Sequence, residues 1–212
     1  MKIILIFMWF AFTFSKNIIL IGDSRTYLMA TQLFGFPLTP DSSIKSKTPV
    51  YYNGHSIYVT AKGGARVYDF VSGDLYNSMH EQISKAPKGT LVFLWLGINN
   101  IRKFVDTRNL YVGLAETYKH VKFYAFSVAG VNETALINIH EAKNNLVLMF
   151  NLQLSNLIRD NKVNTPHLVF KNIMKDPLTF KSGQNILQYL YDGIHFNAAG
   201  SKIIFNLMTE GI

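Results

Sequence analysis

Three short segments carry the residue types that serine-based acyl transfer requires. Gly22-Asp23-Ser24 supplies a hydroxyl group, Gly97-Ile98-Asn99-Asn100 supplies side-chain amides, and Asp192-Gly193-Ile194-His195 supplies an imidazole with a nearby carboxylate. A serine nucleophile needs a base that takes its proton, a group that orients this base, and donors that stabilise the oxyanion. Each segment is common by itself, but the three together predict a single hydrolytic site.

The hydroxyl of Ser24 is the predicted nucleophile. The apolar run Asn17–Ile21 precedes it, and a helix is expected to begin near Thr26. Ser24 would therefore lie at the carboxyl end of a strand, where open α/β sheets bind their ligands. The alternative is that Asp23 and Ser24 only cap the helix.

Asp192 and His195 are the predicted acid–base pair. Their spacing lets the carboxylate in a short turn reach one ring nitrogen while the other ring nitrogen faces the serine. With an ordinary histidine pKa near 6.5, activity is expected to rise through pH ~6–7. A polar turn with a surface histidine is the alternative.

Two further segments offer hydrogen-bond donors for an oxyanion. Asn99 follows the strand-like run Leu91–Leu96, and its side-chain N–H is the predicted donor, with Asn100 as a competitor. Gly64 follows the strand-like run Ile57–Ala61, and its main-chain N–H is accessible because no Cβ intervenes. Ordinary turn positions for Asn99 and Gly64 are the alternative.

Composition is typical of a globular protein with one domain. The chain is 49% hydrophobic and 16% charged, which is typical of a protein with a full hydrophobic core. Its 212 residues are enough for one domain and too few for two domains of ordinary size. The absence of cysteine excludes disulfides and thiolate catalysis. The histidines lack the spacing of a zinc site, so no metal site is predicted.

The net charge of +8 is spread along the chain. Proteins that bind nucleic acid usually concentrate their basic residues on one stripe. The scattered pattern favours a solvated, lysine-rich surface and argues against a nucleic-acid partner. Attraction to an anionic polysaccharide or a membrane surface stays open.

The first 15 residues have the pattern of a secretory signal peptide. Lys2 precedes the apolar stretch Ile3–Phe14, and Thr13 and Ser15 are small enough for a signal-peptidase site. We expect a secreted or extracytoplasmic domain over residues 16–212, without stable membrane insertion after signal removal. An uncleaved signal anchor and an integral first strand are the alternatives.

Strand-like and helix-like segments alternate along the rest of the chain. The predicted strands are Asn17–Ile21, Ser56–Ala61, Leu91–Leu96, Lys122–Val128 and His167–Phe170. Nearly continuous apolar runs are typical of parallel strands that are buried on both faces. The alternation predicts one α/β domain, a three-layer α/β/α sandwich with a mainly parallel, flavodoxin-like sheet of about five strands.

Helical spacing predicts which apolar residues face the core. The first such stripe consists of Val67, Phe70, Val71 and Leu75. A helix over Asn144–Ile158 places on one side Leu148, Leu152, Ser155 and Ile158, widened by Val147 and Leu154. The last helix, over about Ala198–Met208, turns inward Ile203, Ile204, Leu207 and Met208. The predicted connectors are Pro37–Pro49, Gln82–Lys88 and Asp176–Gln184.

Four ordered segments resemble the sequence blocks of SGNH hydrolases, also called GDSL-type esterases and lipases. They are Gly22-Asp23-Ser24, Gly63-Gly64, Gly97-Ile98-Asn99-Asn100 and Asp192-Gly193-Ile194-His195. The resemblance extends over about residues 17–209. Two residues depart from the family pattern: Arg25 replaces the usual leucine, as in a small GDSR-type subgroup, and Asn100 replaces the usual aspartate.

This resemblance implies a cofactor-independent serine esterase. The implied catalytic residues are Ser24, His195 and Asp192, and the implied oxyanion hole consists of the N–H groups of Ser24 and Gly64 with the side chain of Asn99. The expected substrate is a small-molecule or carbohydrate ester with a short acyl group, such as O-acetyl, because the chain has little length for a lid.

Contacts with substrate are predicted for Arg25, Asn100 and Phe196. A structurally paired arginine and an aromatic core residue are the alternatives for Arg25 and Phe196. Two other functions compete with hydrolysis on the same fold: a secreted, non-catalytic carbohydrate-binding or adhesion module, and an acyltransferase.

Overall fold

The structure is a computed structural model that describes residues 15–136, 143–162 and 164–212. The predicted signal peptide at residues 1–15 lies almost entirely outside these ranges. Within them, no helix combines the length and the apolar character that a membrane crossing requires.

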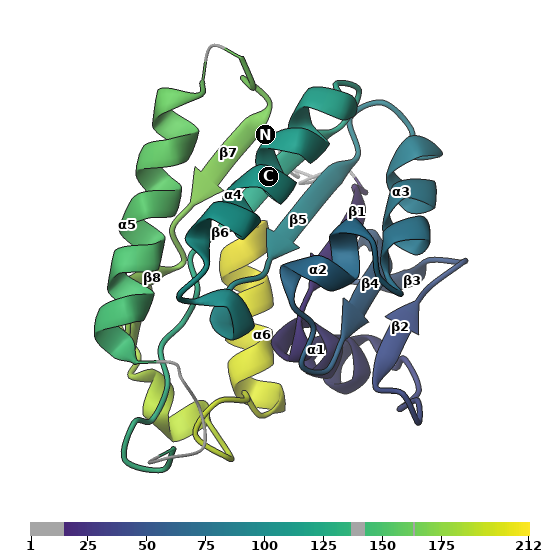
Figure 1. Cartoon of the computed structure of the whole chain (residues 1–212). Helices are drawn as coiled ribbons and strands as arrows, with labels where there is room; N and C mark the ends of the chain where they lie inside the picture. Colours follow the sequence, from purple (N-terminus) through teal and green to yellow (C-terminus); the bar gives the residue numbers. More distant parts are fainter. Residues whose placement is uncertain (1–14, 137–142, 163) are drawn as a thin grey trace, which may run out of the picture.

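A seven-stranded sheet forms the middle layer of the molecule (Figure 1). Its parallel strands are β1 (Asn17–Gly22), β4 (His55–Lys62), β5 (Leu91–Trp95), β6 (Lys122–Phe126) and β7 (Leu168–Lys171). They lie in the order β4-β1-β5-β6-β7, so the second parallel strand of the chain lies outside the first. This is the flavodoxin-like order, and the predicted fold class is confirmed.

Two short antiparallel strands lie beyond the predicted sheet. β2 (Ser43–Lys45) and β3 (Val50–Tyr52) both pair with β4. The prediction that Pro37–Pro49 is only a loop is therefore wrong. The turn between β3 and β4 consists of Asn53 and Gly54, both with positive φ, and this combination is typical of a tight hairpin.

Helices cover both faces of the sheet (Figure 1). One face carries α1 (Ser24–Phe34) and α6 (Ala198–Thr209). The other face carries α2 (Val67–Val71), α3 (Tyr76–Ser84), α4 (Phe104–Thr117) and α5 (Asn144–Asp160). Ile18 and Leu20 of β1 point to the first layer, and Ile19 and Ile21 point to the second. The continuous apolar run thus reflects burial on both faces.

The predicted stripe over residues 67–75 is interrupted: Val67, Phe70 and Leu75 are buried as predicted, whereas Val71 is exposed, and Leu75 lies just before the next helix, α3. α2 ends at Val71, and Ser72 and Gly73 direct their N–H groups to the carbonyl oxygen of Tyr68. Serine and glycine are weaker helix formers than alanine or leucine, so the helix ends there. α3 then extends to Ser84, so the first residues of the predicted connector Gln82–Lys88 are helical.

The helix α5 is confirmed, but its predicted core face is only partly right: Val147, Leu154 and Ile158 are buried as predicted, and Leu148 and Leu152 are not. Leu148 and Leu152 are each 54% exposed, whereas Val147, Phe150 and Leu154 are buried. Both stripes are apolar, so periodicity alone does not choose between them. Packing of Phe150 against Phe104 and of the buried stripe onto the sheet decides the orientation.

Two smaller differences concern the C-terminal part. A hairpin of β8 (Met174–Asp176) and β9 (Thr179–Phe180) lies in the region of the predicted connector Asp176–Gln184. In α6, Ile204 and Met208 are buried as predicted. Ile203 and Leu207, which are also predicted to face the core, are only half-buried, and Phe205 is buried instead.

Candidate active site

The candidate nucleophile lies at the point where the strand order reverses. β1 ends at Gly22, Asp23 caps α1 by accepting the N–H of Arg25 at 3.1 Å, and Ser24 is the first residue of the helix. A Cβ on Gly22 would lie 1.8 Å from Thr26 Oγ1 and 2.8 Å from the carbonyl oxygen of Trp95. Glycine therefore lets α1 begin directly over the sheet, at the edge where such folds bind ligands.

His195 lies in a closed turn, here called the histidine turn (residues 189–197). The N–H of Tyr191 donates to the carbonyl oxygen of His195 at 3.0 Å, and the N–H of Asn197 donates to that of Tyr189 at 2.8 Å. The Asn197 side chain then caps α6 by accepting the N–H of Gly200 at 3.0 Å. The turn is thus closed on itself and tied to the start of a helix.

Asp192 uses both carboxylate oxygens within this turn. Oδ1 accepts the N–H groups of Ile194 and His195 at 3.0 and 2.7 Å, and Oδ2 lies 2.6 Å from His195 Nδ1. Partial burial acts to raise the pKa of Asp192, but the hydrogen bonds from His195 and Ile194 outweigh it and hold the pKa below its ordinary value. The charged carboxylate favours a proton on Nδ1, which leaves Nε2 as an acceptor.

Ser24 and His195 meet across 171 positions of the chain. Ser24 Oγ lies 2.9 Å from His195 Nε2, on the ring edge opposite Asp192. Ser24 is buried, whereas the His195 side chain is 23% exposed. Both hydrogen bonds that the sequence leads us to expect are present, and this alignment permits a proton to pass from the hydroxyl to the ring.

The three predicted oxyanion donors come from the ends of three neighbouring strands. Ser24 opens α1, so its N–H has no acceptor within the helix. Gly64 has a φ of +69° and is exposed, which suits a glycine at a surface turn. Asn99, in the short helix η1 (Ile98–Asn100), donates one N–H of its side chain to the carbonyl oxygen of Ala65 at 3.0 Å. An amide carries two N–H donors, and this bond ties Asn99 to the Gly64 turn.

Comparison with known proteins gives structural matches only. No family profile and no curated protein sequence matches this chain. An acetyl xylan esterase, AlAXEase, superposes with a TM-score of 0.60 at 18% identity over 92% of this chain and 99% of its own. A GDSL-like lipase from Bacteroides thetaiotaomicron gives 0.58 at 19% identity, over 92% and 86% of the two chains. A member of the lipolytic G-D-S-L family from Veillonella parvula gives 0.58 at 15% identity, over 93% and 98%.

The chain has the SGNH/GDSL hydrolase fold. The strand order and the full-length superpositions agree, and the sequence resemblance to SGNH hydrolases led to the same fold. At these identities the matches establish the architecture, and that architecture is the one of ester hydrolases.

Arg25 departs from the SGNH pattern and lies inside the protein. It is 3% exposed, and its guanidinium donates to three main-chain carbonyls: Nε to Ile194 at 3.0 Å, Nη1 to Ala129 at 2.5 Å and Nη2 to Gly130 at 2.7 Å. Its Cζ lies 5.2 Å from the centroid of the Phe196 ring. These contacts favour the structurally paired arginine over a contact with substrate.

Asn100 and Phe196 also occupy supporting positions in this SGNH/GDSL fold. The side-chain oxygen of buried Asn100 accepts the N–H of Val67 at 3.0 Å and so stabilises the start of α2. Phe196 is 2% exposed and packs in the core beneath α1 and α6. These contacts favour a supporting position for Asn100 and the core position for Phe196 over contacts with substrate.

Asp23 is a second carboxyl next to the serine, with a very different environment. Burial raises its pKa to about 6, although Arg25, His195 and the N–H groups of Arg25 and Gly97 act to lower it. Asp23 is 2% exposed. Asp23 is therefore an almost fully buried carboxyl whose pKa lies well above the ordinary value for aspartate.

The sequence analysis missed the support for the histidine turn. The N–H of Asn132 donates to the carbonyl oxygen of Gly193 at 2.8 Å. The loop after β6 (residues 127–132, the β6 loop) is itself held by two asparagines of α5, Asn144 and Asn151. Their spacing of seven on one helix face is visible in the sequence, but their main-chain partners are not.

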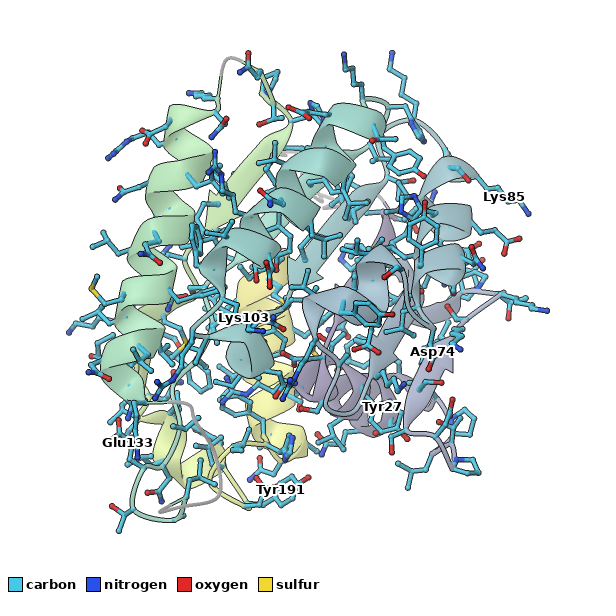
Figure 2. The ribbon with its side chains drawn as sticks, viewed as in Figure 1. Tyr27, Asp74, Lys85, Lys103, Glu133 and Tyr191 are labelled. Carbon is cyan, nitrogen blue, oxygen red and sulfur yellow. The ribbon has the colours of Figure 1, made fainter. Side chains whose placement is uncertain are left out.

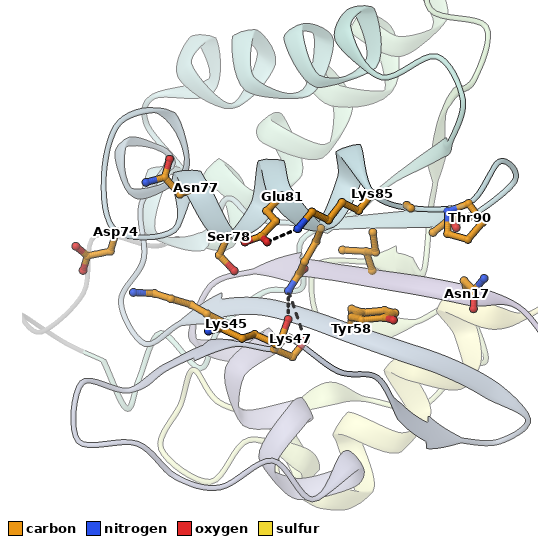
Figure 3. A pocket seen from close by; sticks show the side chains of 15 residues that line it. Asn17, Lys45, Lys47, Tyr58, Asp74, Asn77, Ser78, Glu81, Lys85 and Thr90 are labelled. Carbon is orange, nitrogen blue, oxygen red and sulfur yellow. Dashed lines mark hydrogen bonds and ion pairs between the residues drawn. The ribbon is translucent and has the colours of Figure 1, made fainter.

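A separate pocket of about 540 Å³ lies between α3 and the β2–β4–β1 part of the sheet (Figure 3). Lys45 and Lys47 line it from the β2 side, and Glu81 and Lys85 line it from α3. Among the described residues, its lining includes none of the candidate catalytic groups, and no three histidine or acidic side chains gather as metal ligands.

Tyr191 belongs to the histidine turn and projects from the lower end of the molecule (Figure 2).

Proposed function

We propose that the protein is a serine esterase that hydrolyses carboxylic esters through an acyl-enzyme on Ser24. The observation that carries this proposal is the continuous hydrogen-bonded chain from Ser24 Oγ to His195 Nε2 and from His195 Nδ1 to Asp192, at 2.9 and 2.6 Å. A hydroxyl, an imidazole and a carboxylate in this order are the groups that activate a serine.

The proposed reaction has two steps. His195 takes the Ser24 proton while Oγ attacks the ester carbonyl, and the N–H groups of Ser24, Gly64 and Asn99 stabilise the tetrahedral anion. The protonated ring, stabilised by Asp192, then gives its proton to the leaving alcohol. Water repeats the sequence on the acyl-enzyme, with His195 again as base, and releases the acid.

Short acyl groups on carbohydrate are the proposed substrates. The superposed structure AlAXEase is described as an acetyl xylan esterase, which supports an O-acetyl substrate. Tyr191 supports a carbohydrate as well: it is 59% exposed, and its ring lies beside that of His195, with centroids 6.0 Å apart and an angle of 27° between the planes. An exposed aromatic ring beside the base offers an apolar face to a sugar.

The test compares hydrolysis of p-nitrophenyl acetate, butyrate and octanoate, and acetate release from acetylated xylan. We expect the acetyl esters to be cleaved fastest by the wild-type protein. Ser24→Ala should lower kcat by roughly 10⁴-fold or more, while the control Ser84→Ala, which changes an exposed serine of α3, should leave it unchanged. Wild-type rates equal to those of Ser24→Ala would contradict the proposal and favour the non-catalytic carbohydrate-binding module.

A further inference from the structure

Arg25 connects the two turns that carry the candidate catalytic groups. It follows Ser24 directly in the chain, and its Nε donates to the carbonyl oxygen of Ile194, the residue before His195. The hydrogen bond between Ser24 Oγ and His195 Nε2 closes a ring through these four residues. A shift of the arginine would therefore change the position of the imidazole relative to the hydroxyl.

The histidine turn is held by three hydrogen bonds at two successive residues, Gly193 and Ile194. Asp192 binds the N–H of Ile194, Arg25 binds the carbonyl of Ile194, and Asn132 binds the carbonyl of Gly193. Because the Ile194 peptides are fixed on both sides, rotation of the turn would break at least one hydrogen bond. Arg25 is the member of this set that also belongs to the nucleophile's own helix.

The other two acceptors of Arg25 are held in place by α5. Asn151 both accepts the N–H of Val128 and donates to its carbonyl, at 2.7 and 2.8 Å. Asn144 makes the same pair of bonds to Val131, at 2.9 and 3.0 Å. The carbonyls of residues 129 and 130 lie between these two fixed points, so the guanidinium is anchored on a rigid loop.

The chemistry of the site requires an arginine and not merely a buried side chain. A guanidinium has a planar set of N–H donors and no acceptor, so it can bind carbonyls that approach from several directions. Burial lowers the pKa of Arg25 to about 10, against the opposing effects of Asp23 and Asp192. The side chain therefore stays charged at neutral pH, and the leucine that is usual in SGNH hydrolases would offer none of these bonds.

We propose that Arg25 is a positioning residue that sets the distance between the Ser24 hydroxyl and the His195 ring. This inference rests on the proposed esterase function for its kinetic readout. Arg25 does not touch the substrate; it fixes the histidine turn to the start of α1 and to the β6 loop. Misplacement of catalytic groups by about 1 Å can lower a rate by 10²-fold, so its removal should reduce turnover rather than substrate binding.

The test replaces Arg25 by leucine and by lysine in the full chain. Arg25→Leu should lower kcat for p-nitrophenyl acetate at least tenfold and change KM less than threefold, and Arg25→Lys should fall between it and the wild type. Two controls separate positioning from other effects. Arg159→Leu removes an exposed arginine at the far end of α5, and Leu154→Ala destabilises the core; both should retain kcat at temperatures well below their Tm.

A second readout does not depend on activity. The downfield proton resonance of His195 Nδ1–H reports its hydrogen bond to Asp192, and it should shift or broaden in both Arg25 variants but not in the two controls. An unchanged kcat together with an unchanged resonance in Arg25→Leu would overturn the inference while leaving the esterase proposal intact. A selective rise in KM for an acidic ester, such as p-nitrophenyl hemisuccinate, would overturn it in favour of substrate binding. A shifted resonance in a protein that hydrolyses no ester would support positioning and contradict the proposed function instead.

Discussion

The two turns that meet at the candidate site are stabilised by different forces. The nucleophile turn (residues 22–25) is buried, and close packing fixes its first residue, because a Cβ on Gly22 would collide with Thr26 and with the carbonyl oxygen of Trp95. The histidine turn is partly exposed, with 41% of the Asp192 side chain accessible, and hydrogen bonds fix it. Packing resists displacement at every contact, whereas a hydrogen-bonded turn depends on a few groups.

The aspartates of these turns show the same difference in their acidity. Asp23 is enclosed, and burial raises its pKa to about 6. Asp192 accepts three hydrogen bonds, which hold its pKa below the ordinary value despite partial burial. Neighbouring carboxyls thus differ because one lacks solvent and the other has abundant donors. We therefore expect changes at Asp192 in the histidine turn to affect turnover, and changes at Gly22 and Asp23 in the nucleophile turn to affect stability.

Among the substitutions that test this comparison of the two turns, Asp192→Asn is expected to have the largest effect. An asparagine oxygen can still accept the N–H groups of Ile194 and His195, so the turn should keep its shape. The amide does not stabilise the imidazolium and favours the wrong tautomer of His195, which in serine proteases lowers kcat by roughly 10⁴-fold. We expect a loss of this size for p-nitrophenyl acetate, with Tm changed by only a few degrees. A large fall in Tm with kcat retained would reverse the roles that we assign to the two turns.

Gly22→Ala probes the nucleophile turn by overpacking. The added Cβ would collide with the Thr26 side chain and with the Trp95 carbonyl oxygen, and α1 would have to move away from the sheet. We expect the free energy of unfolding to fall by about 3 kcal/mol, at the upper end of the usual cost of overpacking. Urea denaturation measures this change.

Gly113→Ala is the matched control for that experiment. Gly113 lies in α4, and a Cβ there meets no atom within 4 Å. Alanine should therefore leave stability unchanged or raise it by up to about 1 kcal/mol. Equal effects of the two substitutions would show that the nucleophile turn is not fixed by packing.

The fold and the main catalytic groups could be predicted from the sequence for a physical reason. Parallel strands buried on both faces leave long apolar runs, and the Asp192–His195 pair lies within one short turn. The structure brings this pair to Ser24, as the block order of SGNH hydrolases leads us to expect. Side-chain identity and local spacing are enough for the strands and for the Asp192–His195 pair, whereas the meeting of this pair with Ser24 was expected from the resemblance to SGNH hydrolases.

Features that depend on main-chain hydrogen-bond partners, or on a choice between two apolar stripes of one helix, cannot be predicted from side-chain identity and local spacing. The carbonyls that bind Arg25 have no sequence signature, and the choice between Leu152 and Leu154 on α5 depends on the neighbouring layers. The β3–β4 hairpin is different, because Asn53-Gly54 is a strong turn signal between strand-like runs and was available in the sequence.

The smallest effect is a pH-dependent gain of stability in Asp23→Asn. The folded-state pKa of Asp23, about 6, lies above the ordinary value of 3.8, so the folded protein binds its proton more tightly than the unfolded chain. Stability must then fall as pH rises from about 4 to about 6 and stay constant above that range, with a total loss of roughly 3 kcal/mol for a shift of about two pKa units. A neutral asparagine that accepts the same N–H groups of Arg25 and Gly97 avoids this loss.

We therefore expect Asp23→Asn to be more stable than the wild type by about 2 kcal/mol at pH 8, with no difference at pH 4. Urea titrations across this range measure the difference, and comparison of the two proteins cancels the contributions of other groups. The pH range of the effect also distinguishes the two aspartates. Because the pKa of Asp192 is lowered in the folded protein, the stability that Asp192 contributes is lost only at pH values below its ordinary pKa of 3.8. A difference that grows as the pH falls would mean that Asp23 stabilises the fold as a charged group, and that Arg25 and the local N–H groups outweigh its burial.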